Sequence, residues 1–511
     1  MPSTFHGIEV SKRGIFAQQY GLNITGHNIS NANTEGYTRQ RPNMEATKGI
    51  PAPGMNADRA PGLLGTGVQI SDLQRLREDF LDVQFRNQNK FYGYWEKQSD
   101  VLGKIEEVFK EPSDTGLQSV MDEMWKAFQD LADDPTSSSA RAVLRERAIA
   151  VADTFASVYS QLETMQTDLD NEVNVTVNNI NSLASQIATL NKQIADVVPH
   201  GYQPNDLYDQ RDLLIDKLSK LTDVRVTQGE NGMVNVLMEG QELVNGRNAA
   251  QLATSRNPQT GFLDVTLGGA PFNPVNGRLA AIMDMRGRTV TNPDGTLTLS
   301  GAIPDLMQKL DTLAINLAKE INDVHRQGIN ITDIKNGSTQ PSDLPFFVDK
   351  DELAADANTK EYPKGAKRLT LNPAIMASLD AIAAAKPEAN GQVVEGNNKN
   401  ALDLAAIKQK LISPGTGAND FKETSTLDDF YRYMVGQLGI DRQEGLRKYK
   451  NSEDIVSMVD NQRQSVSGVS IDEEMSELIK YQHAYSASAR VMTSMDEVLD
   501  KVINGMGRVG L

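Results

Sequence analysis

The 511-residue sequence contains no cysteine. Disulfide bonds, metal sites built on thiolates and cysteine nucleophiles are therefore excluded. Because no covalent cross-link or thiolate metal site can hold the chain together, its stability must come from the packing of side chains.

Histidine is scarce, and the motifs of catalytic and metal sites are missing. The five histidines lie far apart and show no His-Glu-x-x-His or comparable spacing: His6, His27, His200, His325 and His483. No Gly-x-Ser-x-Gly motif occurs, and the glycine-rich stretches 65–67 and 415–417 continue neither as a dinucleotide fingerprint nor as a phosphate loop. We therefore expect no catalytic residue, no metal and no cofactor, and a protein that is not an enzyme.

Long apolar runs are also missing, and the N-terminus lacks the charged-then-apolar order of a signal peptide. The 51 Lys and Arg stand against 68 Asp and Glu, and the resulting formal charge of −17 repels phosphate backbones. We therefore expect no nucleic-acid binding and no membrane insertion. Secretion by a system that needs no cleaved signal stays open.

What the sequence has in abundance is helical periodicity, and it is sharpest at the two ends. One apolar residue recurs every seven positions near the N-terminus, and apolar residues follow three- and four-residue spacing near the C-terminus. These residues form two narrow seams: Ile8, Ile15, Leu22 and Ile29 in the first, and Ile471, Met475, Leu478, Tyr485, Met492 and Leu499 in the second. The two helices would most simply pair with each other as one rod and leave other faces for identical neighbours. The alternative is that each seam packs on a neighbouring domain of the same chain.

The N-terminal helix is weak on its own because four glycines interrupt it: Gly7, Gly14, Gly21 and Gly26. Each costs about 1 kcal/mol of helix propensity relative to alanine. Three of them precede seam positions directly, where a missing side chain lets another helix approach closely. We therefore expect a helix that frays alone and is stable when paired.

Between the ends, further helices and one strand-rich stretch are predicted. The expected helices cover residues 71–110, 117–131, 138–198, 205–221, 303–327, 373–385, 401–411 and 426–466. Alternating β-branched residues with Asn-Gly turns predict strands over 224–267. The fold class is therefore mainly α: paired terminal helices forming a coiled-coil-like rod, a long-helix bundle, and a small β-rich middle region.

The chain is too long for one core, because single cores stop growing at roughly 250 to 300 residues. We divide it into four parts. The terminal assembly domain is 1–40 plus 467–511, and the helical bundle is 41–223 plus 277–328 plus 370–466. The small β region is 224–276, and residues 329–369 are predicted to form an exposed loop or small insertion.

Residues 28–40 first read as a helix end and a turn, in which Gly36 can adopt a left-handed conformation. Tyr37 and Arg39 offer stacking and hydrogen bonding for a contact between subunits. The sequence Asn-Ile-Ser-Asn-Ala-Asn-Thr-Glu-Gly-Tyr-Thr-Arg-Gln resembles the N-terminal motif of flagellar rod, hook and hook-associated proteins. The residues of this motif that we single out are Asn31, Asn33, Thr34, Gly36, Tyr37, Arg39 and Gln40.

Three further segments carry the same resemblance. Residues 467–474, with Tyr481-Gln482 after them, resemble the C-terminal motif of this family. Residues 205–226 and 461–468 resemble the hook-associated members, not the hook or rod subunits. The resemblance covers roughly residues 1–245 and 425–511.

The resemblance implies a structural subunit of the bacterial flagellum that joins hook to filament. Such a subunit is exported unfolded through the flagellar type III apparatus without a cleaved signal peptide, and it functions outside the cell. Its implied partners are copies of itself in a ring, the hook protein, the second hook-associated protein, and an export chaperone on the C-terminal helix.

Three alternatives stay open at this point. One is a different axial rod or hook subunit. Another is a flagellar protein with an inserted enzyme domain, against which the missing metal motif argues. The third is a cytoplasmic coiled-coil scaffold, which would not leave the cell.

Overall fold

The computed structural model describes residues 5–50, 64–109, 111, 113–114, 116–291, 297–356, 358–387, 392–415, 417 and 419–505. Its main helices are α1 (His6–Ser30), α2 (Asp79–Phe109), α3 (Leu117–Asp133), α4 (Ser138–Val197), α5 (Asn205–Leu221), α6 (Gly277–Arg286), α7 (Ala302–His325), α8 (Ile331–Lys335), α9 (Lys350–Ala355), α10 (Pro373–Ala377), α11 (Lys399–Ala406), α12 (Leu427–Ser467) and α13 (Ile471–Gly505). The prediction of a mainly α fold with a small β-rich middle is confirmed.

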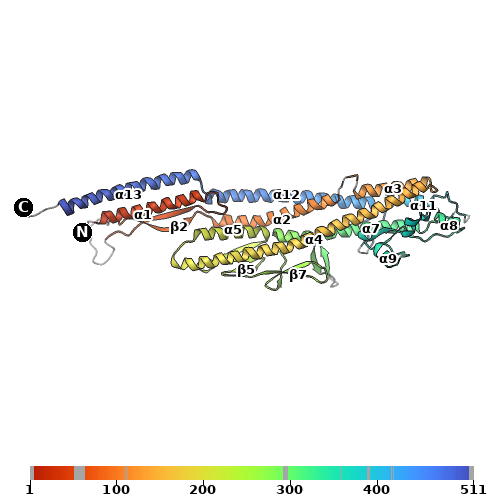
Figure 1. Cartoon of the computed structure of the whole chain (residues 1–511), viewed down its shortest axis with the longest axis horizontal. Helices are drawn as coiled ribbons and strands as arrows, with labels where there is room; N and C mark the ends of the chain where they lie inside the picture. Colours follow the sequence, from red (N-terminus) through yellow and green to blue (C-terminus); the bar gives the residue numbers. More distant parts are fainter. Residues whose placement is uncertain are drawn as a thin grey trace, which may run out of the picture.

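The molecule is elongated, and α1 and α13 lie side by side at one end of it (Figure 1). The start of α1 and the end of α13 lie at the same tip, so the two helices run antiparallel. A hairpin of β1 (Gln40–Ala46) and β2 (Val68–Arg75) follows α1 and packs along it. We call α1, α13 and this hairpin the rod. The last six residues of the predicted terminal domain, 506–511, and its first four lie outside the described part.

The hairpin corrects two expectations. Residues 71–75 belong to β2 and not to the predicted helix 71–110, which begins only at Asp79. The hairpin also lies against α1, although residues 41–75 were assigned to the helical bundle. Leu73 and Leu76 fit a helical spacing, and a bulge between Asn43 and Met44 interrupts the strand register. The sequence pattern of residues 71–76 therefore fits a helix as well as a strand.

The rest of the chain forms the body, whose longest element is α4. Ser137 caps its start, since its Oγ accepts a hydrogen bond from the Ala140 N–H at 3.3 Å. Over roughly 90 Å, α4 buries one stripe that includes Val151, Phe155 and Leu162. Four other helices of the body pack on it, namely α3, α5, α6 and α7, and α2 pairs with α12.

The predicted β region forms two antiparallel sheets on α4. The first has the order β3-β4-β5-β6, with β3 (Val224–Gln228), β4 (Val234–Met238), β5 (Gln241–Asn245) and β6 (Asn248–Ala249). The second has the order β7-β8-β9, with β7 (Leu252–Arg256), β8 (Leu263–Leu267) and β9 (Ala270–Pro271). Two asparagines of α4 bind the sheet backbones: Asn191 bonds Val234, and Asn181 bonds Leu252. Another two-stranded pair, β10 (Arg288–Thr291) with β11 (Leu297–Ser300), precedes α7.

The segment 329–369 was predicted to be an exposed loop or small insertion, and this is wrong for its centre. Phe346, Phe347 and Val348 are fully buried, and β12 (Phe347–Asp349) pairs with β13 (Leu369–Leu371). Burial is possible because Asn322 of α7 satisfies the backbone there. Its Oδ1 accepts from the N–H groups of Phe346 and Phe347, both at 2.8 Å. The surrounding polar residues concealed this short apolar run.

A buried histidine next to this segment makes the stability of the body depend on pH. His325 lies between the Leu344 carbonyl, 2.7 Å from Nδ1, and the Ala383 N–H, which donates to Nε2 at 3.0 Å. This arrangement fits only a neutral ring. Burial lowers the pKa of His325 to about 4. The unfolded chain therefore binds a proton before the folded one does, so stability is lost as the pH falls from about 6.5 towards 4.

We expect the part of this loss that is due to His325 to reach on the order of 3 kcal/mol. It is measured as the difference between the unmodified protein and His325→Gln in how far the free energy of urea unfolding falls from pH 7 to pH 4.5. His325→Gln should remove most of this dependence. Asp311 affects the pH dependence of stability in the opposite direction. Burial raises its pKa to about 6, so its stabilising contribution is lost as the pH rises through 6. Asp311→Asn should therefore steepen the acid loss. An identical pH profile for His325→Gln and the unmodified protein would contradict the assignment.

Candidate assembly interface

Small residues of α1 form its contact with α13. The pairs are Gly7 with Met495, Gly14 with Ser488, and Gly21 with Tyr481. A Cβ added at these glycines would lie 2.9, 3.1 and 2.9 Å from the facing side chains. Both series step by seven residues, so the same contact repeats every two turns. We call this series the glycine ladder. The expected pairing of the terminal helices is present within one chain.

The predicted apolar seams lie beside the ladder, mostly at its flanks. Ile8, Ile15, Leu22 and Ile29 each follow a ladder position and are half-buried. On α13, Leu499 is buried, Leu478 and Met492 are half-buried, and Ile471, Met475 and Tyr485 are exposed. The ladder glycines directly face side chains of α13, and the larger seam residues lie to their sides. Their burial on assembly stays a prediction.

A polar group ends the ladder nearest the body. Asn28 and Glu474 are 1% and 2% exposed, and Asn28 Nδ2 donates to Glu474 Oε2 at 3.0 Å. The same amide donates to the Gln40 carbonyl at 2.9 Å, and Asn28 Oδ1 accepts from the Gln40 N–H at 3.1 Å. Asn28 therefore joins α1, the start of β1 and α13.

Residues 31–40, which carry the family motif and which we call the family turn, follow α1. This helix ends at Ser30 and not at Gly36. Asn31 donates to the His27 carbonyl at 3.0 Å, and Thr34 donates to Asn31 at 3.2 Å, whereas Asn33 is exposed. Gly36 has the left-handed conformation expected of it, with φ at +81°. A Cβ at Gly36 would also lie 3.0 Å from Leu213 of α5, so both the turn and the contact favour glycine.

We expected Tyr37 and Arg39 to contact other subunits. In the structure of the single chain, both residues and the neighbouring Gln40 make contacts within the chain. Tyr37 donates to Asn28 Oδ1 at 2.8 Å, and burial raises its pKa. Arg39 binds Glu473 and Glu474 at 2.5 and 2.6 Å. Burial alone would lower the pKa of Arg39, but these two hydrogen-bonded carboxylates outweigh it and raise the pKa. Gln40 donates to Asp206 at 2.8 Å.

Arg75, the last residue of β2, and Arg77, just after it, bind carboxylates of α5 and α2. Arg75 Nη1 lies 2.8 Å from Asp209 and 3.0 Å from Asp212. Arg77 binds Asp82 through two nitrogens, at 2.5 and 2.9 Å, and donates to Thr38 at 3.2 Å. Burial opposes ionisation of Asp212, but Arg77 and Arg75 outweigh it and hold its pKa below the usual range. The hairpin is thus held to the body by partly buried ion pairs.

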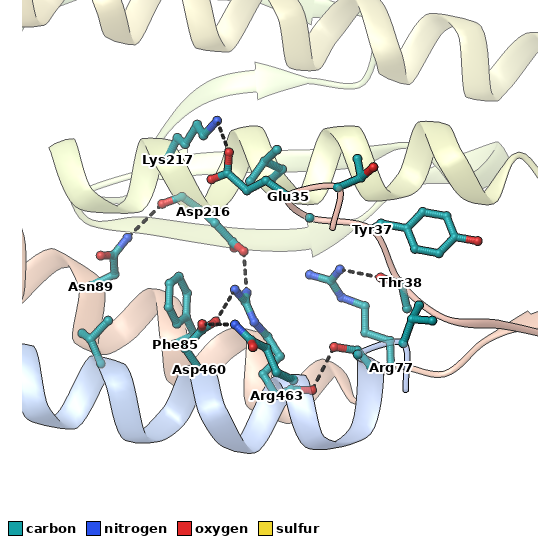
Figure 2. A pocket seen from close by; sticks show the side chains of 18 of the residues that line it. Glu35, Tyr37, Thr38, Arg77, Phe85, Asn89, Asp216, Lys217, Asp460 and Arg463 are labelled. Atoms are coloured by element: carbon teal, nitrogen blue, oxygen red, sulfur yellow. Dashed lines mark hydrogen bonds and ion pairs between the residues drawn. The ribbon is translucent and has the colours of Figure 1, made fainter. Parts of the chain in front are cut away.

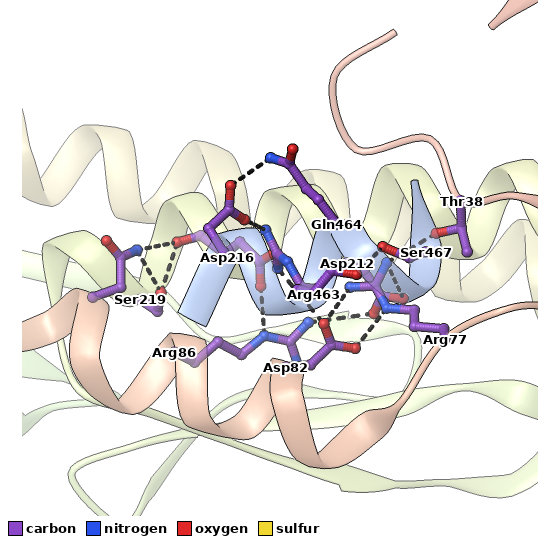
Figure 3. A network of polar contacts seen from close by, with 12 residues as sticks. Thr38, Arg77, Asp82, Arg86, Asp212, Asp216, Ser219, Arg463, Gln464 and Ser467 are labelled. Atoms are coloured by element: carbon purple, nitrogen blue, oxygen red, sulfur yellow. Dashed lines mark hydrogen bonds and ion pairs between the residues drawn. The ribbon is translucent and has the colours of Figure 1, made fainter. Parts of the chain in front are cut away.

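A second set of ion pairs joins α2, α5 and α12 (Figure 3). Asp216 of α5 accepts from Arg86 of α2 at 2.6 Å and from Arg463 of α12 at 2.5 Å. Arg463 also binds Asp460 at 2.8 Å and lies over the Phe85 ring. Three helices from distant parts of the sequence therefore meet at one carboxylate.

A cavity of about 600 Å³ lies between the family turn and these helices. Figure 2 shows Glu35, Tyr37 and Thr38 of the turn on one side, with Phe85, Asp460 and Arg463 on the other. We call the region that contains the turn, the two sets of ion pairs and this cavity the joint, because it connects rod to body.

Four residues of the joint had no role predicted from sequence, although they lie in segments that carry the family resemblance: Asp209, Asp212, Asp216 and Arg463. The three aspartates recur on one face of α5 at helical spacing, which was the available signal. Their arginine partners lie far away in sequence and gave none. Within the described residues, no cluster of His, Asp and Glu is arranged to hold a metal ion, and no helix is long and apolar enough to cross a membrane.

Known proteins share this architecture and its motifs. The model of the flagellar hook-associated protein FlgK helical domain matches residues 102–340. Models of the flagellar basal body rod protein and of the FlgEFG C-terminal region match residues 8–38 and 461–505. The structure of FlgK from Burkholderia pseudomallei has a TM-score of 0.58 at 16% identity, covering 76% of this chain and 100% of that one, which shows a shared fold.

Two curated relatives extend over almost the full length. Flagellar hook-associated protein 1 of Escherichia coli (strain K12) is 26% identical, with 96% of this chain and 98% of the relative covered. The protein of the same name from Bacillus subtilis (strain 168) is 37% identical over 529 aligned residues, which cover 99% of both chains. The rod and the body are both included in this match, so the chain belongs to the flagellar hook-associated protein 1 (FlgK) family.

Proposed function

We propose that this protein is the structural subunit that joins hook to filament in the bacterial flagellum. The full-length similarity to hook-associated protein 1 of Bacillus subtilis carries the proposal. The Burkholderia neighbour is described as a flagellar hook junction protein, which supports the same role. In this proposal the protein is not an enzyme, and it functions outside the cell after type III export.

The rod is the part that assembles. Apolar side chains stay exposed on it even after α1 and α13 have paired: Phe16, Ile471, Met475, Ile479, Val498 and Ile503. Exposed apolar side chains that gather on one part of a molecule favour contact with other proteins. The proposed partners are copies of the chain in a ring, the hook protein, the second hook-associated protein and, before export, a chaperone on α13.

Deletion of the gene tests the proposal. Hooks without filaments, together with unassembled flagellin in the medium, would support the junction role. Cells without hooks would indicate a different axial subunit. Intact filaments, with the protein retained in the cytoplasm, would indicate a scaffold.

Within that experiment, Leu22→Asp should fail to restore filaments. Leu22 is half-buried beside the glycine ladder, and burying a large apolar side chain contributes about 1.5–3 kcal/mol, whereas a buried unpaired carboxylate costs more. We expect at least a tenfold drop in the number of filaments per cell, counted by electron microscopy. Asn23→Asp is the matched control, because Asn23 is the next residue and is exposed. Equal filament numbers for the two variants would show that Leu22 is not part of the assembly surface.

A further inference from the structure

One side of the joint is tied by specific bonds. On this side the hairpin meets the N-terminal part of α5. Asn205 donates to the Leu73 carbonyl at 2.9 Å, and Asp209 accepts from the Thr38 N–H at 2.9 Å. Arg75 and Gln40 add the bonds to α5 described above. These groups are largely buried, so the edge of the rod that carries the hairpin is fixed to the body.

The opposite side of the joint is open. Here the cavity of about 600 Å³ separates residues 32–38 from α2 and α12 (Figure 2). Near Thr38, Arg77 bridges the two walls, because it donates to Thr38 at 3.2 Å and binds Asp82 of α2. Along the rest of the turn, an ion pair reaches towards α5, between Lys217 and Glu35 at 3.4 Å, and their side chains are 49% and 74% exposed. An exposed pair at this distance restrains little. Space therefore exists on this side for the rod to approach the body or to withdraw from it.

No helix runs through the joint in the described chain. α12 ends at Ser467 and α13 begins at Ile471, and Gly468 between them has extended backbone angles, with φ −72° and ψ 152°. A Cβ at Gly468 would lie 2.4 Å from the Gln464 carbonyl, so this break suits glycine. Since a continuous helix would make the connection stiff, its interruption leaves the link between rod and body short and bendable.

Arg39 is the residue on which the crossing segments converge. Its N–H donates to the Ser467 carbonyl at 2.9 Å, and its own carbonyl accepts from the Leu76 N–H at 2.9 Å. Its guanidinium holds Glu473 and Glu474 in the first turn of α13. The backbone of Arg39 therefore lies at the pivot, while its side chain fixes the direction in which α13 leaves the body.

We propose that the joint is a hinge clamped by the Arg39 side chain. The rod turns as a unit about the edge tied to α5, and the cavity narrows or widens as it turns. The Arg39 contacts with Glu473 and Glu474 restrict this motion. The hinge itself does not depend on the proposed function, but its use does: a subunit placed between two different assemblies can adapt the angle between its rod and body to each.

Distances between spin labels test the clamp in the purified full-length chain. Because the sequence has no cysteine, labels can be placed without removing any. Asp454→Cys on α12 and Ser486→Cys on α13 are exposed positions on opposite sides of the joint, roughly 50 Å apart if the helices lie end to end. Asp454→Cys with Glu107→Cys provides a pair inside the body.

Arg39→Met should at least double the width of the distance distribution across the joint and leave the pair inside the body unchanged. Raising the salt concentration to 1 M, where the Debye length is about 3 Å, should weaken the exposed Arg39–Glu473 pair more than the buried Arg39–Glu474 pair. The distribution of the unmodified protein should therefore broaden less than that of Arg39→Met. Lys480→Met is the matched control, because it removes an exposed α13 ion pair with Glu477 away from the joint. It should change neither distribution.

An Arg39→Met distribution as narrow as that of the unmodified protein would overturn the proposal. Broadening of both label pairs would also overturn it, since that result means partial unfolding and not a hinge. If Arg39→Met does not fold, Glu473→Gln removes half of the clamp and should give a smaller broadening of the same kind. Because these measurements need no flagella, their failure is distinguishable from failure of the junction role.

Discussion

Gly21→Leu should separate α13 from α1 in the isolated protein. A Cβ at this position already lies 2.9 Å from the Tyr481 ring, and the further atoms of leucine would occupy the same space. Overpacking of this kind costs about 1–3 kcal/mol, which is large for a contact between two helices that lie at one end of the molecule. Amide hydrogen exchange in both helices should accelerate at least tenfold, while the body keeps its protection.

Gly26→Leu is the matched control for this change. No atom lies within 4 Å of a Cβ added at Gly26, so leucine fits there and should add about 1 kcal/mol of helix propensity. The same substitution five residues apart should therefore have opposite effects. If both variants showed the same exchange rates, the glycine ladder would not be the contact that pairs the helices.

Asp216→Ala should destabilise the body most among single changes at the joint. It would leave the guanidinium groups of Arg86 and Arg463 without their shared carboxylate, in a site where Asp216 is 7% exposed. Removing one partner of a buried ion pair costs about 3–5 kcal/mol. We expect a loss of this size in the free energy of urea unfolding, followed by circular dichroism.

The control for Asp216→Ala is Asp454→Ala, an exposed aspartate on α12. Surface changes of this type stay within about 0.5 kcal/mol. Asp216→Asn keeps one acceptor and should fall between the two. A loss below about 1 kcal/mol for Asp216→Ala would show that water reaches the two arginines and that the ion pairs do not hold the three helices together.

The contrast between α5 and the hairpin shows what the sequence could predict. The helices α4 and α5 were predicted almost to the residue, because amphipathic stripes and, for α4, the Ser137 cap act locally. The β1–β2 hairpin was missed, since its two strands are joined by a long connection and one of them also fits a helical spacing. Phe346 and Phe347 were missed because their burial depends on Asn322, more than twenty residues earlier.

For the candidate interface, too, local patterns were predicted and long-range contacts were not. A repeat of seven residues correctly indicated two helices that pair, and the glycines directly before the seam residues indicated where the partner helix could approach closely. The residues that face these glycines, Met495, Ser488 and Tyr481, were not predicted. Most ion pairs of the joint join segments that are more than a hundred residues apart, such as Arg86 with Asp216 and Arg39 with Glu474. With 68 acidic residues in the chain, no local rule could have selected these partners.

The distance along the chain between α1 and α13 also has a consequence for the order of folding. Asn28 and Glu474, which bind each other, are separated by 446 positions. Contacts of such high sequence separation form late, because the entropy of closing a long loop must be overcome first. Body helices such as α3 and α4, which are neighbours in sequence, can fold while the C-terminus is still being synthesised. The two ends therefore close last, and until then each remains an unpaired segment that another chain can bind.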